Sequence, residues 1–377
     1  MLKIEVNRQS LLNILQIESR GASQHADLPI LGSVLVQTEE GSSNTLKLTS
    51  TNLNQAILSK IKANIISEGI VAVPARITIE FLSSLSDEIV TLEEGKNLRL
   101  KISTKNHQSS IYLLNPEDYP KIPEISKKES IKLKASDFRD AINSVAFASS
   151  KDDTRPVFCG VMVYTANDSS LCMVSTDSYR LAEKTIPRET STNSVEDLII
   201  PSATIQDVLK VIQSQEVELI ELIAEAEQVS FIVGEVTIIS RLISGDYPAY
   251  KNLIPASSDT NFTIDRGELL QTVKIASLFA RESAGAISLQ VEKEDQVLTV
   301  NSIANQVGEN HSQVAISTDT SGSINLNSRY LIEALNSFDS DLLDVRFSKG
   351  LAPFVISSHS DKKTEPSHLH LIMPINT

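Results

Sequence analysis

Alternating apolar residues run into a helical pattern near the start of the chain, and the same change recurs twice more. Residues 2–6 alternate and lead into a helical pattern over 10–15, and equivalent changes occur at 131–145 and 262–276. Apolar residues two apart indicate a strand and residues three or four apart indicate a helix, so each site predicts a strand followed by a helix. The repeat length is close to one third of the 377-residue chain.

A second helix is predicted later in each unit, at 73–85, 200–212 and 326–338, and these three segments align without gaps. Each carries apolar residues three positions apart, which gives the helix one apolar face toward a core. Pro74 and Pro201 stand where two of these helices begin, a position that suits the fixed φ of proline. Short alternating runs between the helices indicate mostly antiparallel strands.

The pattern therefore predicts an α+β chain built from three tandem copies of one unit, each with two helices and mostly antiparallel sheet. Two units finish with a Tyr-Pro step and a later proline, and polar stretches follow at 126–130 and 257–260, which we interpret as linkers. The expected domains are 1–124, 125–256 and 257–377.

Composition narrows the class of protein. The apolar fraction of 41% is enough for packed cores, and the net charge of −14 excludes a uniformly basic surface but permits a local one. There is neither a signal-peptide pattern nor an apolar run of about 18 residues, so we expect a soluble, cytoplasmic chain with no membrane partner. Cys159 and Cys172 lack metal-ligand spacing and are interpreted as core residues. No metal or cofactor is expected.

Cations recur at matching helix positions. Arg76 and Arg329 occupy the same place in their units, and Lys210 lies two turns along the corresponding face of the middle unit. Lys274 and Arg281 are seven residues apart on a predicted first helix. Units that stack head to tail can close into a ring, on which these charges would line a pore and contact a phosphate backbone. On the charge pattern alone, solvated helix faces are the favoured interpretation of these cations.

Enzymatic chemistry has little support. Residues 319–322 read Asp-Thr-Ser-Gly, as in an aspartic-protease loop, but only one copy is present where such enzymes need two. His368 and His370 share one side of a predicted strand without a third ligand at suitable spacing, so a solvated strand is expected there. No nucleophile elbow or glycine-rich phosphate loop occurs. Apart from a nucleic-acid clamp, the open alternative is a non-enzymatic three-domain scaffold or adhesion protein without DNA binding.

Four segments, at 28–31, 175–182, 245–250 and 371–375, resemble the bacterial sliding clamps, the β subunit of DNA polymerase III. They are spread along the whole chain in the expected order. The resemblance implies a homodimeric, head-to-tail ring around double-stranded DNA, bound without sequence preference, that confers processivity and has no catalytic residues. The partners it implies are the replicative DNA polymerase, an ATP-dependent clamp loader and clamp-motif proteins of repair.

The resemblance also implies three sets of site residues. With the charge pattern, it places toward DNA the residues Arg20, His25, Arg76, Lys210, Lys274, Arg281 and Arg329. The partner-peptide groove would comprise Phe158, Thr176, Tyr179, Arg180, Leu181, Pro248, Leu253, Asn327, Tyr330, Leu351, Leu371, Ile372, Met373, Pro374 and Ile375. The dimer interface would involve Ser109, Ile111, Leu113 and Leu278.

The chain departs from the family pattern at several of these positions. Ser178 and Tyr179 stand where the family commonly has Gly-His, Asn252 stands where a basic residue is common, and the chain ends in Asn376-Thr377. We therefore expect a turn that differs slightly at 178 and a shifted preference among partner motifs.

Overall fold

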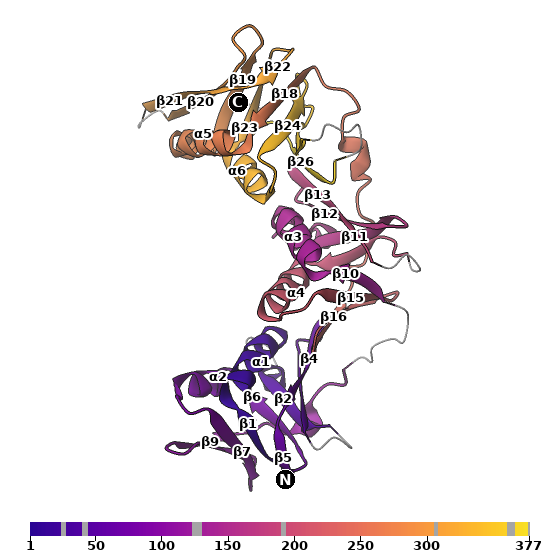
Figure 1. Cartoon of the computed structure of the whole chain (residues 1–377), viewed down its shortest axis with the longest axis vertical. Coiled ribbons are helices and arrows are strands. Elements are labelled where there is room, and N and C mark those ends of the chain that lie inside the picture. The colour runs from indigo at the N-terminus through magenta and orange to yellow at the C-terminus, as the bar shows by residue number, and fades with distance from the viewer. Residues whose placement is uncertain are drawn as a thin grey trace. The chain divides into compact units, whose positions relative to one another are not determined.

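The structure, a computed structural model, describes a chain that divides into two compact units (Figure 1). The first unit combines Met1–Ala135 with Gln206–Leu242, and the second combines Ser136–Ile205 with Ile243–Thr377. The chain passes between them within helix α4 (Ser202–Ser214). The described residues are 1–23, 28–39, 44–122, 130–189, 194–304, 308–359 and 366–375.

The first unit contains two antiparallel sheets. The smaller has the order β5-β1-β7-β8-β9, with bounds Asn64–Ser67, Lys3–Asn7, Ile89–Gly95, Arg99–Ser103 and Gln108–Tyr112. The larger has the order β10-β15-β16-β17-β4-β3-β2-β6, with bounds Ile131–Lys134, Leu219–Ala224, Gln228–Val233, Val236–Arg241, Gln55–Lys62, Thr45–Thr51, Ser33–Thr38 and Ile70–Pro74. The predicted repeat units thus share sheets, because β17 pairs with β4.

Helices α1 (Arg8–Gly21) and α2 (Ala75–Ser84) lie in the first unit together with most of α4. Helix α1 packs against α2 and against β4. Asn7 caps α1 by accepting a hydrogen bond from the Ser10 amide at 3.0 Å. Short 3₁₀ turns lie at Pro29–Gly32 and Pro116–Asp118.

The second unit repeats this architecture. Its larger sheet has the order β14-β11-β12-β13-β26-β25-β24-β18-β22, with bounds Leu198–Pro201, Gly160–Asn167, Ser170–Thr176, Arg180–Pro187, His368–Ile372, Phe354–Ser358, Leu342–Phe347, Thr260–Asp265 and Ser317–Thr318. Its smaller sheet has the order β21-β20-β19-β23, with bounds Gly308–Ala315, Val297–Ala304, Ala286–Glu292 and Gly322–Asn327. The pair β13–β26 joins strands that lie far apart in the sequence.

Helices α5 (Arg266–Phe279) and α6 (Ser328–Ser337) pack side by side over an apolar core that includes Leu269, Leu335 and Phe347 (Figure 1). Helix α3 (Ala135–Val145) begins at the unit boundary. Four 3₁₀ turns, η3 to η6, lie at Ala146–Ala148, Pro156–Cys159, Tyr250–Leu253 and Arg281–Ser283. All six predicted helices are present, and the predicted α+β class with antiparallel sheet is confirmed.

The internal repeat is visible in individual hydrogen bonds. The Thr51 hydroxyl donates to the Gln55 carbonyl at 2.8 Å and accepts from the Leu53 amide at 3.0 Å. The Thr176 hydroxyl makes the corresponding bonds, to the Arg180 carbonyl at 2.6 Å and from the Ser178 amide at 3.1 Å. Leu53 and Ser178 both have a positive φ, of 75° and 79°. The segments 50–55 and 175–180, which begin Ser-Thr-Asn and Ser-Thr-Asp, therefore form the same turn.

A carboxyl group is buried under helix α1. Glu18 has no exposed surface, and it accepts hydrogen bonds from the Ser50 hydroxyl at 2.6 Å and the Ser59 hydroxyl at 2.5 Å. Burial raises the pKa of Glu18 to about 8, against the lowering effect of these two hydrogen bonds. Gly21 is required one turn further on, because a Cβ there would lie 2.4 Å from the Ser50 oxygen. The helix is thus fixed by a polar contact inside the unit.

Three sequence expectations need correction. Arg281 does not continue helix α5 but lies in the following 3₁₀ turn, because the helix ends at Phe279. Cys172 is buried as predicted, whereas Cys159 is only half-buried, since it belongs to an irregular turn rather than a strand. Pro74 occupies the N-cap position of α2, one residue before the helix begins at Ala75, and makes no side-chain capping hydrogen bond.

The predicted linkers are only partly described. Thr260 already belongs to β18 and is buried, so the second polar stretch is shorter than expected. Most of the first, residues 126–129, lies outside the described residues. The boundaries of the three expected domains stay a prediction.

Candidate functional site

The pairing of β13 with β26 brings together apolar residues from two ends of the second unit. Leu181 lies opposite Leu371 in this register. Both belong to a cluster that also includes Met162, Val174, Tyr250, Val355 and Leu369, with Tyr164, Tyr247, Ile254 and Met373 packed against it. We call this the strand cluster. The predicted groove residues Leu181, Leu371 and Met373 therefore lie in one apolar group, as expected for the floor of a peptide groove.

Strand alternation separates the tail residues. Ile372 points to the other face of β26 and is buried in the core under α5 and α6, so its side chain is not part of the strand cluster. The Met373 amide donates to the Tyr179 carbonyl at 2.8 Å, and the Ile375 amide donates to the Asn325 carbonyl at 3.0 Å. The first bond holds the tail against the turn before β13 and the second holds it against β23, with Pro374 between them.

The turn before β13 keeps the backbone that glycine would favour. Ser178 has a φ of 79°, in the left-handed region, which costs roughly 1 kcal/mol for a residue with a Cβ. Its hydroxyl accepts a hydrogen bond from Arg155 at 3.0 Å, and the Asp177 carboxylate accepts from the Tyr179 amide at 2.9 Å. These polar contacts hold Ser178 in the left-handed conformation, and the expected slight difference of this turn from that of the family stays a prediction.

Arg180 is buried beneath this turn, with 9% of its side chain exposed. Its Nε donates to Asp177 at 3.0 Å, its Nη2 donates to the Phe147 carbonyl at 2.9 Å, and its Nη1 donates to Glu333 on α6. The guanidinium also lies 4.6 Å from the centre of the Tyr330 ring. Arg180 therefore supports the predicted groove from below.

Exposed apolar side chains accompany the strand cluster. Tyr179, Leu253 and Leu351 are exposed by 61%, 52% and 64%. Pro248 is also exposed, and Phe158 is half-buried with its ring edge toward Tyr247 at 6.5 Å between ring centres. Exposed apolar groups beside an apolar cluster are typical of a surface that binds other proteins.

The remaining predicted groove residues have structural duties. Thr176 is buried and closes the turn before β13, and Asn327 caps α6 by accepting from the Arg329 amide at 2.9 Å. Sequence reasoning missed Arg155 and Tyr247. Arg155 lies 5.0 Å above the Phe158 ring, a contact between loop residues that no periodic pattern indicates. Tyr247 lies in the segment 245–250 that resembles the sliding clamps, but the resemblance implied no role for it.

The predicted DNA-facing cations are mostly exposed on helices. Arg76 on α2, Lys210 on α4, Lys274 on α5 and Arg329 on α6 are exposed, as is Arg281 in its 3₁₀ turn. Arg76 pairs with Glu80, and Arg329 pairs with Glu333, each at 2.9 Å and four residues on. These acids occupy equivalent positions in the two repeats.

Two members of the predicted DNA-facing set differ from the others. His25 lies outside the described residues. Arg20 has 35% of its side chain exposed and lies 3.6 Å from Asp207 of α4, within the same unit. Burial raises the pKa of Asp207, against hydrogen bonds from Gln55 and Arg20 and the positive charges of Arg20 and Lys210. Arg20 is thus engaged in an internal ion pair.

The smaller sheet of each unit has an outer strand among the described residues, β9 in the first unit and β21 in the second. β9 is the outer strand of the five-stranded sheet, where Ser109 and Ile111 are half-buried and Tyr112 is 68% exposed. Leu113 follows the strand and is buried, so its side chain belongs to the interior. In the second unit, Leu278 on α5 is 55% exposed, and β21 is the outer strand of its sheet. The sequence had indicated neither Tyr112 nor the β21 edge.

The predicted solvated strand at His368 and His370 is wrong. Both side chains are buried, their Nε2 atoms lie 2.8 Å apart, and Ser337 of α6 lies 2.7 Å from His370 Nε2. Burial lowers the pKa of both imidazoles. The charges of His370 and Lys184 act in the same direction on the pKa of His368, and those of Arg180 and Lys184 on that of His370. Among the described residues, no group of three or more His, Cys, Asp or Glu could hold a metal ion.

Family models match nearly the whole chain. The N-terminal, central and C-terminal domains of the DNA polymerase III beta subunit match residues 2–123, 132–249 and 251–375. A beta sliding clamp from Staphylococcus aureus is 28% identical and one from Staphylococcus epidermidis is 27% identical, each over 100% of both chains.

Solved structures agree with these matches. The DNA polymerase III beta chain of Streptococcus pneumoniae superposes with a TM-score of 0.91 at 25% identity, over 100% of both chains. The DNA polymerase sliding clamp of Bacillus subtilis superposes with a TM-score of 0.92 at 24% identity, over 100% of this chain and 99% of that one.

The repeated α+β units and the matches along them define a sliding clamp. The chain belongs to the DNA polymerase III beta subunit family. Members of this family are processivity factors rather than enzymes, so the prediction of a non-enzymatic chain is confirmed, and a scaffold unrelated to DNA is not favoured. Within the described residues, no helix is long and apolar enough to cross a membrane.

Proposed function

We propose that two copies of the chain close head to tail into a ring around double-stranded DNA and tether the replicative polymerase to it. An ATP-dependent loader would open the ring, and clamp-motif proteins of repair would use the same surface as the polymerase. The observation that carries this proposal is the repeat itself, with matching helices and matching turns at Thr51 and Thr176. Replication clamps act on the chromosome, so we propose a cytoplasmic location.

The exposed helix cations are the proposed DNA contacts. Arg76, Lys210, Lys274, Arg281 and Arg329 would each neutralise backbone phosphates, with no base readout. Glu80 and Glu333 already pair with two of them, which limits the net attraction. Weak contact suits a ring that holds DNA by enclosure, since tight binding would oppose sliding. Arg20 and His25 remain in the proposed set, Arg20 with the smallest role because Asp207 competes for it.

The strand cluster and its exposed apolar neighbours are the proposed partner-peptide groove. Leu181, Leu371 and Met373 would form its apolar floor, and Tyr179, Leu253 and Leu351 would close over the peptide. Pockets with apolar walls and a few polar groups suit short extended motifs that carry Leu and Phe. Thr176, Arg180, Asn327 and Tyr330 would hold the groove's shape from beneath.

The proposed dimer interface uses the two sheet edges. β9 ends one sheet and β21 ends another, and an unpaired edge strand is a ready template for pairing with a second chain. Ile111 and Tyr112 on β9 would meet Leu278 and β21 of the second subunit. Leu113 would support β9 from the interior.

Retention on circular DNA tests the proposal. Loaded onto a nicked circle by a clamp loader, the chain should stay bound through gel filtration and should be lost when the circle is cut. The matched control is Ile111→Lys, which places a charge on the β9 edge of the proposed dimer interface and should prevent ring closure. This variant should therefore dissociate from circular and linear DNA equally. Equal retention of the unaltered chain on both DNA forms would contradict enclosure.

A further inference from the structure

A second cleft adjoins the strand cluster within the second unit. It encloses about 760 Å³ over β11, β13 and β26. Tyr164, Ile254 and Leu369 line this cleft and also belong to or pack against the strand cluster that contains Leu181 and Leu371. The apolar floor of the cleft is therefore continuous with that of the proposed groove, because both belong to the strand cluster.

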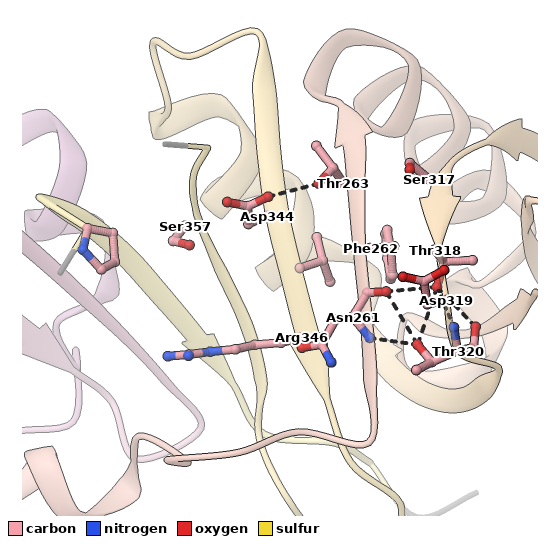
Figure 2. Close-up of a pocket in the computed structure, with 12 residues that line it drawn as sticks. Asn261, Phe262, Thr263, Ser317, Thr318, Asp319, Thr320, Asp344, Arg346 and Ser357 are labelled. Atoms are coloured by element: carbon pink, nitrogen blue, oxygen red, sulfur yellow. Dashed lines mark hydrogen bonds between the residues drawn. The ribbon is translucent and has the colours of Figure 1, made fainter. Parts of the chain in front are cut away.

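Two cations line this cleft. Lys251 lies with its Nζ 5.2 Å from the centre of the Tyr164 ring and has no acidic partner within the described residues. The side chain of Arg346, on β24, likewise makes no hydrogen bond or ion pair with the described part of the chain. Figure 2 shows its side chain stretched along the sheet, away from Asp319 and Thr320, with no dashed line to it. These are charges without an internal partner.

The carboxylates nearby are already engaged. Glu183, which lines the cleft, accepts a hydrogen bond from the Tyr250 hydroxyl, and Tyr250 lies 2.8 Å from the Tyr164 hydroxyl. Asp344, two residues before Arg346, accepts from Thr263 at 2.9 Å and lies 2.8 Å from His359 Nδ1 (Figure 2). Of the described residues that line the cleft, the charged ones are thus two cations and one carboxylate, which favours an anionic occupant.

We propose that this cationic cleft binds an acidic stretch of the partner polypeptide whose Leu-Phe motif occupies the groove. The inference rests on the proposed function. A polypeptide is the occupant favoured by continuity, because one extended chain can cover the apolar floor and carry carboxylates to Arg346 and Lys251. The planar guanidinium of Arg346 matches a carboxylate in a two-bond geometry, and Lys251 adds a point charge.

The consequence is a preference among partners. Both cations are accessible to solvent, so the added affinity is modest and sensitive to salt. A partner with glutamate or aspartate beside its motif would associate faster and be favoured over one with neutral flanks.

Fluorescence anisotropy with labelled Leu-Phe peptides tests this inference. Three peptides are compared, with Glu-Glu on the amino side of the motif, with Glu-Glu on the carboxyl side, and with Gln-Gln on both sides. One of the two acidic peptides should bind about tenfold more tightly at low salt than the neutral one. This gain in affinity should shrink in 0.5 M salt, because the Debye length is then about 4 Å and exposed charges are screened from one another.

Variants assign that gain to the cleft. Arg346→Gln and Lys251→Gln should each reduce it about threefold, and the double variant should remove it, while the neutral peptide binds as before. The matched control is Lys349→Gln, an exposed cation in the turn after β24 that does not line the cleft. Equal binding of all three peptides, or a gain that survives the double variant, would overturn the inference. If the neutral peptide itself does not bind, the proposed groove is refuted, and the proposal for the cleft, which depends on it, is refuted as well.

Discussion

Two arginines in the second unit bind the same carboxylate from different surroundings. Arg180 reaches Glu333 from beneath the proposed groove with 9% of its side chain exposed, and Arg329 reaches it on the surface of α6 with 72% exposed. Burial alone would raise the pKa of Glu333, but hydrogen bonds from Arg180 and Arg329 outweigh it, and the pKa is lowered. The comparison shows that one chemical contact can serve two purposes: a buried charge fixes a structure, and an exposed one remains available to a ligand.

The largest expected effect is the loss of the buried member. Arg180→Met removes the side-chain donor to Asp177 Oδ2 and to the Phe147 carbonyl inside the unit, so the free energy of unfolding should fall by about 3–5 kcal/mol. Arg329→Met, the matched exposed variant, should lower it by less than about 1 kcal/mol. Hydrogen exchange of β13 and β26 during urea unfolding reports both values. Similar losses in the two variants would contradict the comparison.

Lowering the pH provides a second test of buried groups in the second unit. His368 and His370 have a lowered pKa in the folded state, so below about pH 6.5 the unfolded chain takes up protons that the folded chain refuses. The stability of the second unit should therefore be full above that pH and fall as pH decreases, by about 2 kcal/mol per histidine at pH 5. Unfolding of His370→Gln between pH 5 and 8 is the measurement, since this variant should lose part of the slope. An unchanged slope would show that the pair does not control it.

The first unit should respond to pH in the opposite direction. The pKa of Glu18 is raised to about 8 when folded, so between its ordinary value of 4.5 and about 8 the unfolded chain loses a proton that the folded chain keeps. Stability from this group is present below pH 4.5 and is lost as pH rises toward 8. At pH 5, the Glu18→Gln variant should have the same free energy of unfolding as the unaltered chain. At pH 9 it should be more stable than the unaltered chain by about 2 kcal/mol, which is less than the maximum that the pKa shift allows at about 1.4 kcal/mol per pKa unit. Equal urea midpoints at pH 9 would argue against a buried neutral carboxyl.

The smallest effect belongs to the exposed cations. Arg329→Ala should leave folding nearly unchanged and reduce the salt dependence of DNA binding by about 0.9 in the logarithmic slope if it contacts one phosphate. Arg76→Ala is the matched variant, because Glu80 lies four residues on just as Glu333 does. Titrations of a fluorescent duplex at several salt concentrations give the slopes. An unchanged slope in both variants would place these helix faces away from DNA.

The sequence predicted the repeated elements well because they depend on local periodicity. The helices beginning at Ala75, Ser202 and Ser328 lie where gap-free alignment placed them. It failed at His368 and His370, whose alternation indicated one face of a strand but could not say that α6 covers that face. The sequence also could not show that Leu371 lies in the strand cluster whereas Ile372 lies in the core under α5 and α6. Which face of β26 packs against which core depends on elements that are distant in the sequence.

The order of apolar and polar residues by itself determined the three tandem units, their paired helices and the likeness of their turns, because each of these arises from contacts between residues close in the chain. Tertiary structure alone decided which polar groups are buried. Glu18 meets Ser59, and Arg180 meets Glu333, across separations of 41 and 153 residues. Desolvation depends on everything packed around a group, so no local pattern could indicate which arginine would become a fixed support and which would stay available to DNA.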